Sequence, residues 1–160
     1  MEINVLIDEG VDANPDRNWL ATVAERALAA EHASPNTELG LVLTTQERIQ
    51  ELNRDYLGRD RPTDVIAFHM LPATEDSEGS FPPFITPPDG TTHLGEVIIS
   101  YPQAVIQAEE QQHSVSKELT ILIIHGVLHI LGYRDDEPEL KRQMQAREAE
   151  ILSTMEGDPG

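Results

Sequence analysis

The chain has 160 residues, of which 29 are Asp or Glu and 11 are Lys or Arg, so its formal net charge is -18. A chain of this length suits one domain that buries roughly two thirds of its unfolded surface. The negative field repels polyanions, so composition alone argues against a nucleic-acid-binding protein. The chain has no cysteine, which excludes disulfides and thiolate metal sites, so any metal must be held by His, Asp or Glu.

The N-terminal residues lack the basic start and the long apolar run of a signal peptide. No stretch is apolar for long enough to cross a bilayer. We therefore expect a soluble, cytoplasmic protein without membrane or DNA partners. The one basic cluster, Arg54, Arg59 and Arg61, is interleaved with Asp55 and Asp60. A mixed solvated surface therefore explains this cluster as well as a local nucleic-acid-binding patch does.

The first part of the chain predicts two strands that alternate with two helices. Asn14 and Pro15 are typical of a helix start, as N-cap and first helical residue. Thr44 and Glu47 have the spacing of a capping box, and Gly58 is suited to end the helix that this box begins. The four elements are expected at residues 2–8, 15–30, 39–43 and 45–57.

The second part of the chain predicts two further strands, a long loop and three helices. Pro62 stands at the start of the first of these strands, where proline is tolerated. The run from Leu94 to Ser100 is apolar enough for a central strand. The strands are expected at 62–68 and 94–100, the loop at 71–92, and the helices at about 102–112, 115–131 and 138–154.

These elements predict one domain over residues 1–154, which includes the long loop 71–92 and is followed by a flexible tail at 155–160. No internal repeat divides the chain. The expected fold class is α+β: a small mixed four-stranded sheet covered by about five helices, with the helix at 115–131 buried against the sheet.

Two histidines, His125 and His129, lie four residues apart inside the most apolar stretch of the chain, Leu119 to Leu131. On a helix this spacing places both imidazoles on one face, about 6 Å apart at Cβ. The apolar residues on every side of them predict a buried helix. A buried imidazole needs a partner for each ring nitrogen, and a shared metal ion satisfies one nitrogen of each ring.

An acidic turn follows this helix. Gly132 is suited to end the helix in a left-handed conformation, and Arg134, Asp135, Asp136 and Glu137 come next. A carboxylate from this turn can fold back toward the histidines and complete a set of three ligands. Two histidines and one carboxylate leave a coordination position open, which is typical of catalytic rather than structural zinc sites.

The segment from His125 to Tyr133, His-Gly-Val-Leu-His-Ile-Leu-Gly-Tyr, resembles the signature of the YbeY endoribonucleases, metal-dependent enzymes of ribosomal RNA maturation. Segments 52–65, 94–100 and 144–152 are similar to that family in order and spacing. The resemblance spans nearly the whole chain. It implies a zincin-like fold and a single-strand-specific endoribonuclease that matures ribosomal RNA, including the 3′ end of 16S rRNA, and acts in ribosome quality control. The implied partners are an rRNA precursor and the small ribosomal subunit.

The resemblance also implies one zinc ion held by His125, His129 and a third residue. Asp135 stands where the family has a third histidine, and a small deletion would instead align Asp136 with that position. Aspartate is an acceptable zinc ligand, so Asp135 is the expected one.

The resemblance also implies a catalytic residue with a positively charged side chain. The family usually has an arginine directly after its conserved tyrosine, and Leu57 occupies that position here. Arg59, two positions further on, is therefore the candidate catalytic residue. A guanidinium suits this role because its planar donors match a phosphate.

Two other functions remain open at this point. A zinc peptidase commonly has a glutamate beside the first histidine as general base, but Gly126 stands there, so Glu96 would have to replace it. The second alternative is a non-enzymatic ribosome-binding module whose metal is structural. That module would bind metal tightly and cleave no RNA.

Overall fold

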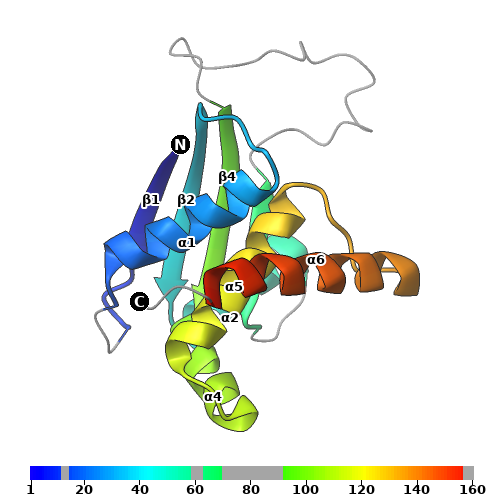
Figure 1. Cartoon of the computed structure of the whole chain (residues 1–160). Coiled ribbons are helices and arrows are strands. Elements are labelled where there is room, and N and C mark those ends of the chain that lie inside the picture. The colour runs from blue at the N-terminus through cyan, green and yellow to red at the C-terminus, as the bar shows by residue number, and fades with distance from the viewer. Residues whose placement is uncertain (12–14, 59–62, 70–91, 157–160) are drawn as a thin grey trace.

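The computed structural model describes residues 1–11, 15–58, 63–69 and 92–156. Within these residues the chain forms one four-stranded sheet in the order β1-β2-β4-β3 (Figure 1). The three strands β1, β2 and β4 are parallel, and β3 pairs antiparallel with β4 at the edge. The strand bounds are Glu2–Ile7 for β1, Thr37–Thr44 for β2, Val65–His69 for β3 and Thr92–Ser100 for β4.

Five helices in the described part of the chain surround this sheet. They are α1 (Arg17–Ala30), α2 (Gln46–Leu57), α4 (Tyr101–Gln111), α5 (Val115–Ile130) and α6 (Pro138–Glu156). The α+β class, the mixed four-stranded sheet and the central position of β4 are thus confirmed. None of these helices is long and apolar enough to cross a membrane.

The two faces of the sheet have different cores. Leu41 and Val97 point to the face covered by α1 and α5, where the main apolar cluster lies. Ile98 and Ile66 point to the other face and pack with Ile49 of α2. This division follows from the alternation of side chains along a strand.

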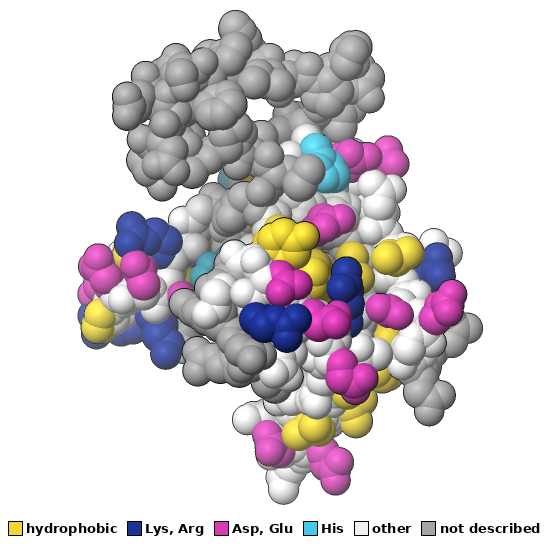
Figure 2. All heavy atoms as spheres, turned by 180° about the vertical axis from the view of Figure 1, so that it is seen from behind, with side chains coloured by type: hydrophobic (Ala, Val, Ile, Leu, Met, Phe, Trp, Pro, Cys, Tyr) yellow, Lys and Arg dark blue, Asp and Glu magenta, His cyan; other side chains and the backbone are white. Residues whose placement is uncertain are grey.

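The face that carries α2 is hollowed beside that helix and holds a cavity of about 600 Å³, lined in part by Leu6, Val42, Tyr56 and Glu96. Seen from behind, the molecule presents acidic side chains interspersed with basic and hydrophobic ones (Figure 2). Because Glu96 lines this cavity beside α2, it belongs to the face of the sheet opposite α5.

Helix α5 is the central element of the domain, because it contacts α1, α4, α6, β3 and β4. Ten of its 16 residues are buried, which confirms the prediction of a buried helix. Gly126 is needed where α5 crosses β4: a Cβ at this position would lie 2.5 Å from Cγ1 of Val97. A larger residue would push the helix away from the sheet.

Several element boundaries differ from the prediction, and the two N-caps differ for identifiable reasons. Asp16, rather than Asn14, caps α1, because its carboxylate accepts from the backbone N–H groups of the first turn. Thr45, rather than Thr44, caps α2. The hydroxyl of Thr44 is instead buried and donates to Asp8 on the neighbouring strand end, at 2.9 Å.

The remaining differences concern β3, α6 and the loop. β3 begins at Val65 rather than at Pro62, which lies outside the described residues. α6 continues to Glu156, so residues 155 and 156 belong to the helix and not to a tail. The predicted loop at 71–92 lies outside the described residues except for Thr92, which opens β4.

Candidate metal centre

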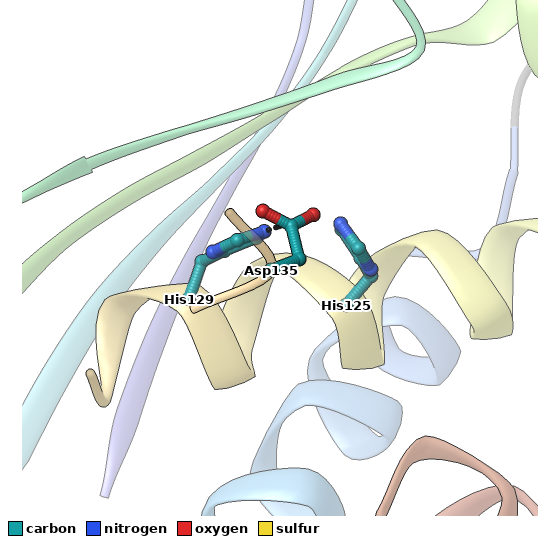
Figure 3. Close-up of side chains that lie close together, drawn as sticks. All are labelled: His125, His129 and Asp135. Atoms are coloured by element: carbon teal, nitrogen blue, oxygen red, sulfur yellow. Dashed lines mark ion pairs between the residues drawn. The ribbon is translucent and has the colours of Figure 1, made fainter. Parts of the chain in front are cut away.

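The side chains of His125, His129 and Asp135 come together at the C-terminal end of α5 (Figure 3). One ligand atom from each residue lies within 4.8 Å of the other two. The two imidazole centroids are 4.6 Å apart with planes at 77°, and Nε2 of His129 is 3.5 Å from Oδ2 of Asp135. The arrangement supplies two nitrogens and one carboxylate, a donor set that binds divalent metal ions.

The chain reverses sharply after α5, and this turn returns Asp135 to the histidines. Gly132 has φ 109°, a left-handed conformation that glycine adopts without steric cost. The N–H of Tyr133 donates to the carbonyl of Leu128 at 2.9 Å, and the N–H of Gly132 donates to that of His129 at 3.1 Å. These bonds close the helix end as expected.

Of the two adjacent aspartates, the structure places Asp135 beside the histidines. The guanidinium of Arg134 donates twice to the carboxylate of Asp136, at 3.1 and 2.6 Å, and this hydrogen bonding lowers the pKa of Asp136. The carboxylate of Asp136 is therefore paired with the guanidinium of Arg134 within the turn.

Each histidine has a hydrogen-bond acceptor on its Nδ1 atom. Nδ1 of His125 bonds to the carboxylate of Glu148 on α6, and Nδ1 of His129 bonds to the backbone carbonyl of Tyr133 at 3.1 Å. A carboxylate and a carbonyl can only accept, so both Nδ1 atoms carry the proton. The lone pair of each Nε2 is then available on the side of Asp135, and the residues present fit a divalent metal ion.

The electrostatic surroundings favour a cation at this site. Burial of the His125 ring lowers its pKa, but the hydrogen bond to Glu148 and the negative charges of Glu148, Asp64 and Asp135 outweigh burial and raise the pKa above 6.5. The side chains of His125, His129 and Asp135 are 31%, 27% and 44% exposed. The site is therefore negative and open to solvent.

The sequence also contains a basic cluster, Arg54, Arg59 and Arg61, in which Arg59 is the candidate catalytic residue. Arg59 and Arg61 fall outside the described residues, and the side chain of Leu57 is not described either. Arg54 lies on α2 with its guanidinium 3.2 Å from Asp55.

Sequence reasoning missed Glu148 as the partner of His125. A signal was present, because Glu148 lies one helical turn after Met144 and one before Ile151, both of which are buried. A carboxylate at this spacing on the buried face of a helix needs a partner.

Comparison with known proteins finds relatives that match nearly the whole chain. The sequence model of the family described as Endoribonuclease YbeY matches residues 3–156. Proteins named Endoribonuclease YbeY are similar to this chain in Dehalococcoides mccartyi strain 195 (46% identical over 148 residues, 92% of this chain and 86% of the relative) and in Chloroflexus aurantiacus strain J-10-fl (38% over 154 residues, 96% and 94%). The protein of the same name from Brevibacillus brevis is 41% identical over 147 residues, which are 90% of this chain and 89% of the relative.

A solved structure supports the fold. The solution structure of TM1509 from Thermotoga maritima aligns with a TM-score of 0.55 and 22% identity, and the alignment covers 98% of this chain and 93% of that one. At this identity the likeness concerns the fold alone. The family match and the relatives show more: the chain belongs to the YbeY endoribonuclease family.

Proposed function

We propose that this protein is a metal-dependent endoribonuclease that cleaves single-stranded RNA in ribosomal RNA maturation, including 16S rRNA 3′-end processing, and in ribosome quality control. Its place of action is the cytoplasm and its substrate an rRNA precursor on the small ribosomal subunit. The observation that carries the proposal is the convergence of His125, His129 and Asp135 in a solvent-open site. Membership of the YbeY family supports the choice of RNA as substrate.

We propose one zinc ion as the cofactor, held by Nε2 of His125, Nε2 of His129 and the carboxylate of Asp135. When bound, such an ion lowers the pKa of a coordinated water and neutralises charge on a phosphate. The carboxylate adds negative charge that a third histidine would not, so Mn²⁺ or Mg²⁺ should be better tolerated than at a site with three histidines. The local positive charge of a bound ion also offsets the acidity of the chain, whose net charge is -18.

Arg59 is proposed as the catalytic residue that binds the scissile phosphate. It lies five residues before Asp64, whose charge acts on His125. Five residues span at most about 18 Å, so the sequence allows Arg59 to reach the metal centre. The planar guanidinium would bind two phosphate oxygens at once.

The peptidase alternative has no general base at Gly126, and its one substitute, Glu96, does not face α5. Gly126 has no side chain, and its contact with Val97 leaves no room for one. Glu96 lies on the face of the sheet opposite α5, among the residues that line the cavity beside α2. The cluster offers three ligands among the described residues, whereas a structural zinc site is closed by four, and this difference argues against the second alternative.

The test is cleavage of a single-stranded RNA oligonucleotide, with a duplex of the same sequence as control. Purified protein is stripped with a chelator and reloaded with Zn²⁺ or Mn²⁺. We expect cleavage of the single strand only, dependent on added metal, and lost in His129→Ala. Arg59→Ala should retain the metal and lose cleavage. Bound metal without RNA cleavage would favour the ribosome-binding module, and peptide cleavage would favour the peptidase.

A further inference from the structure

Two adjacent residues of α6, Arg147 and Glu148, connect this helix to both histidines of the metal centre. The direct connection is the hydrogen bond between Glu148 and Nδ1 of His125. The side chain of Glu148 is only 19% exposed. Met144 and Ile151, one turn away on either side, are buried and anchor this face of α6.

The second connection runs through the end of α1. The guanidinium of Arg147 pairs with the carboxylate of Glu31 and donates to the carbonyl of Ala30 at 2.6 Å. The other oxygen of Glu31 accepts from the hydroxyl of Tyr133 at 2.8 Å. The backbone carbonyl of Tyr133 is the atom that accepts from Nδ1 of His129.

The pairing of Glu148 with His125 differs from the pairing of His93 with Glu38. His93 and Glu38 are 2.6 Å apart, and among the described residues they are not part of a cluster of potential metal ligands. The opposite nitrogen of His125 faces two further ligand groups. A carboxylate on Nδ1 of such a ring keeps the proton on that nitrogen, orients the ring and makes Nε2 a better donor.

We propose that Glu148 is a positioning residue of the metal centre: it holds His125 in the tautomer and orientation that metal binding needs. The Glu31–Arg147 pair supports His129 in the same way, but less directly, by holding Tyr133. The inference rests on the metal site of the proposed function, and it concerns metal affinity rather than RNA cleavage.

The test measures the dissociation constant for Zn²⁺, by competition with a chromophoric chelator, for Glu148→Gln and Glu148→Ala. Loss of a partner that supports a metal-bound histidine typically weakens metal binding by about 10–100-fold. We expect Glu148→Ala to lie in this range. Glu148→Gln should lie between it and the wild type, because an amide oxygen still accepts from Nδ1 but carries no charge.

Glu38→Gln is the matched control, because it changes the same kind of pair at His93, outside the metal centre. It should leave the affinity for Zn²⁺ unchanged within about twofold. The visible absorption spectrum of the Co²⁺-loaded protein is the second measurement. It should change in Glu148→Ala and stay the same in the control, which a merely structural role for Glu148 would not produce.

Tyr133→Phe tests the second connection. It removes the hydroxyl that donates to Glu31, and it keeps the backbone carbonyl of residue 133 that accepts from His129. A loss of zinc affinity smaller than that of Glu148→Ala is expected. The inference is overturned if Glu148→Ala and Glu148→Gln, folded by circular dichroism, bind Zn²⁺ as tightly as the wild type. It stands, while the proposed function fails, if both variants lose affinity but the wild-type protein cleaves no RNA.

Discussion

Helix α5 has a histidine–carboxylate pair at each end, and the two pairs differ in what surrounds them. Before its first turn, His113 bonds to Glu118 at 2.6 Å. Toward its last turn, His125 bonds to Glu148. The pairs use the same chemistry, and only the second lies in a cluster of potential metal ligands among the described residues.

At the first end of α5, the polar side-chain atoms form hydrogen bonds with other side chains of the protein. Glu118 is 4% exposed, and its second oxygen accepts from Gln107 at 2.7 Å. The chain of hydrogen bonds continues through Gln103 to Gln46 on α2. This network joins α2, α4 and α5, and it satisfies a buried charge that would otherwise be costly.

At the second end, one nitrogen of each histidine faces Asp135 instead of a hydrogen-bond network. A histidine–carboxylate pair is therefore not by itself a functional site. A site needs additional donor atoms that converge and remain accessible to solvent.

The same substitution at both ends tests the comparison most directly. His125→Ala removes one ligand atom and should weaken Zn²⁺ binding on the order of 100-fold or more, since even loss of a supporting residue costs 10–100-fold. His113→Ala should leave the affinity within about twofold of wild type. Titration against a chromophoric chelator measures both, and equal losses would contradict the distinction between the two ends.

A substitution at the first end of α5, near His113, should lower the stability of the fold rather than the affinity for metal. Glu118→Ala leaves His113 and Gln107 without their buried acceptor, so we expect the free energy of unfolding to fall by about 2–3 kcal/mol. The affinity of the folded variant for Zn²⁺ should not change. Urea denaturation of the chelator-treated protein gives the free energy. A wild-type value for Glu118→Ala would mean that the network at this end does not stabilise the fold.

The two adjacent aspartates of the acidic turn, Asp135 and Asp136, can be compared at the second end of α5. Asp135→Ala removes the carboxylate beside the histidines and should weaken Zn²⁺ binding by about tenfold or more. Asp136→Ala removes the partner of Arg134, which is exposed, and should change the affinity by about twofold at most. Bound metal per protein after gel filtration checks both variants. A stronger loss in Asp136→Ala would reverse the assignment of the third ligand.

A smaller effect is expected at Asp8, a carboxylate that directly follows β1. Hydrogen bonds from the N–H of Gly10 (3.1 Å) and the hydroxyl of Thr44 (2.9 Å) hold its pKa below 3.8. A lowered pKa in the folded state stabilises the protein above the unfolded pKa, so Asp8→Asn should cost about 1 kcal/mol at neutral pH.

The dependence on pH is the check on this explanation. As the pH falls below 3.8 and through the folded pKa of Asp8, wild-type Asp8 is protonated and loses its advantage. The difference in unfolding free energy between Asp8→Asn and wild type should therefore shrink toward zero in acid. Urea denaturation of both proteins in chelator measures it, and a difference that stays constant down to acid pH would rule out the charge of Asp8 as the cause.

Local patterns predicted that the three groups of the candidate metal centre converge, because these groups lie within one helix and the turn after it. The spacing of His125 and His129 determines that they share a face. Gly132 determines that the chain reverses, so Asp135 returns over a short distance. Arg59 stays a prediction, since it lies outside the described residues.

Choices between neighbouring candidates were not predictable in the same way. Thr44 and Thr45 are equally good caps by composition, and the outcome depends on Asp8, which is 36 residues away and takes the hydroxyl of Thr44. For the third ligand the sequence favoured Asp135 and left Asp136 as the alternative; in the structure Asp136 pairs with Arg134, and Asp135 lies beside His129.

The sequence by itself determined the elements, the buried helix and the pair of histidines, since helix periodicity and turn chemistry act over a few residues. Only the tertiary structure decided how the histidines are held. Glu148 is 23 residues from His125, and Arg147 is 116 residues from Glu31. Contacts over such separations depend on how α6 packs against α5 and α1, and no local pattern specifies that packing.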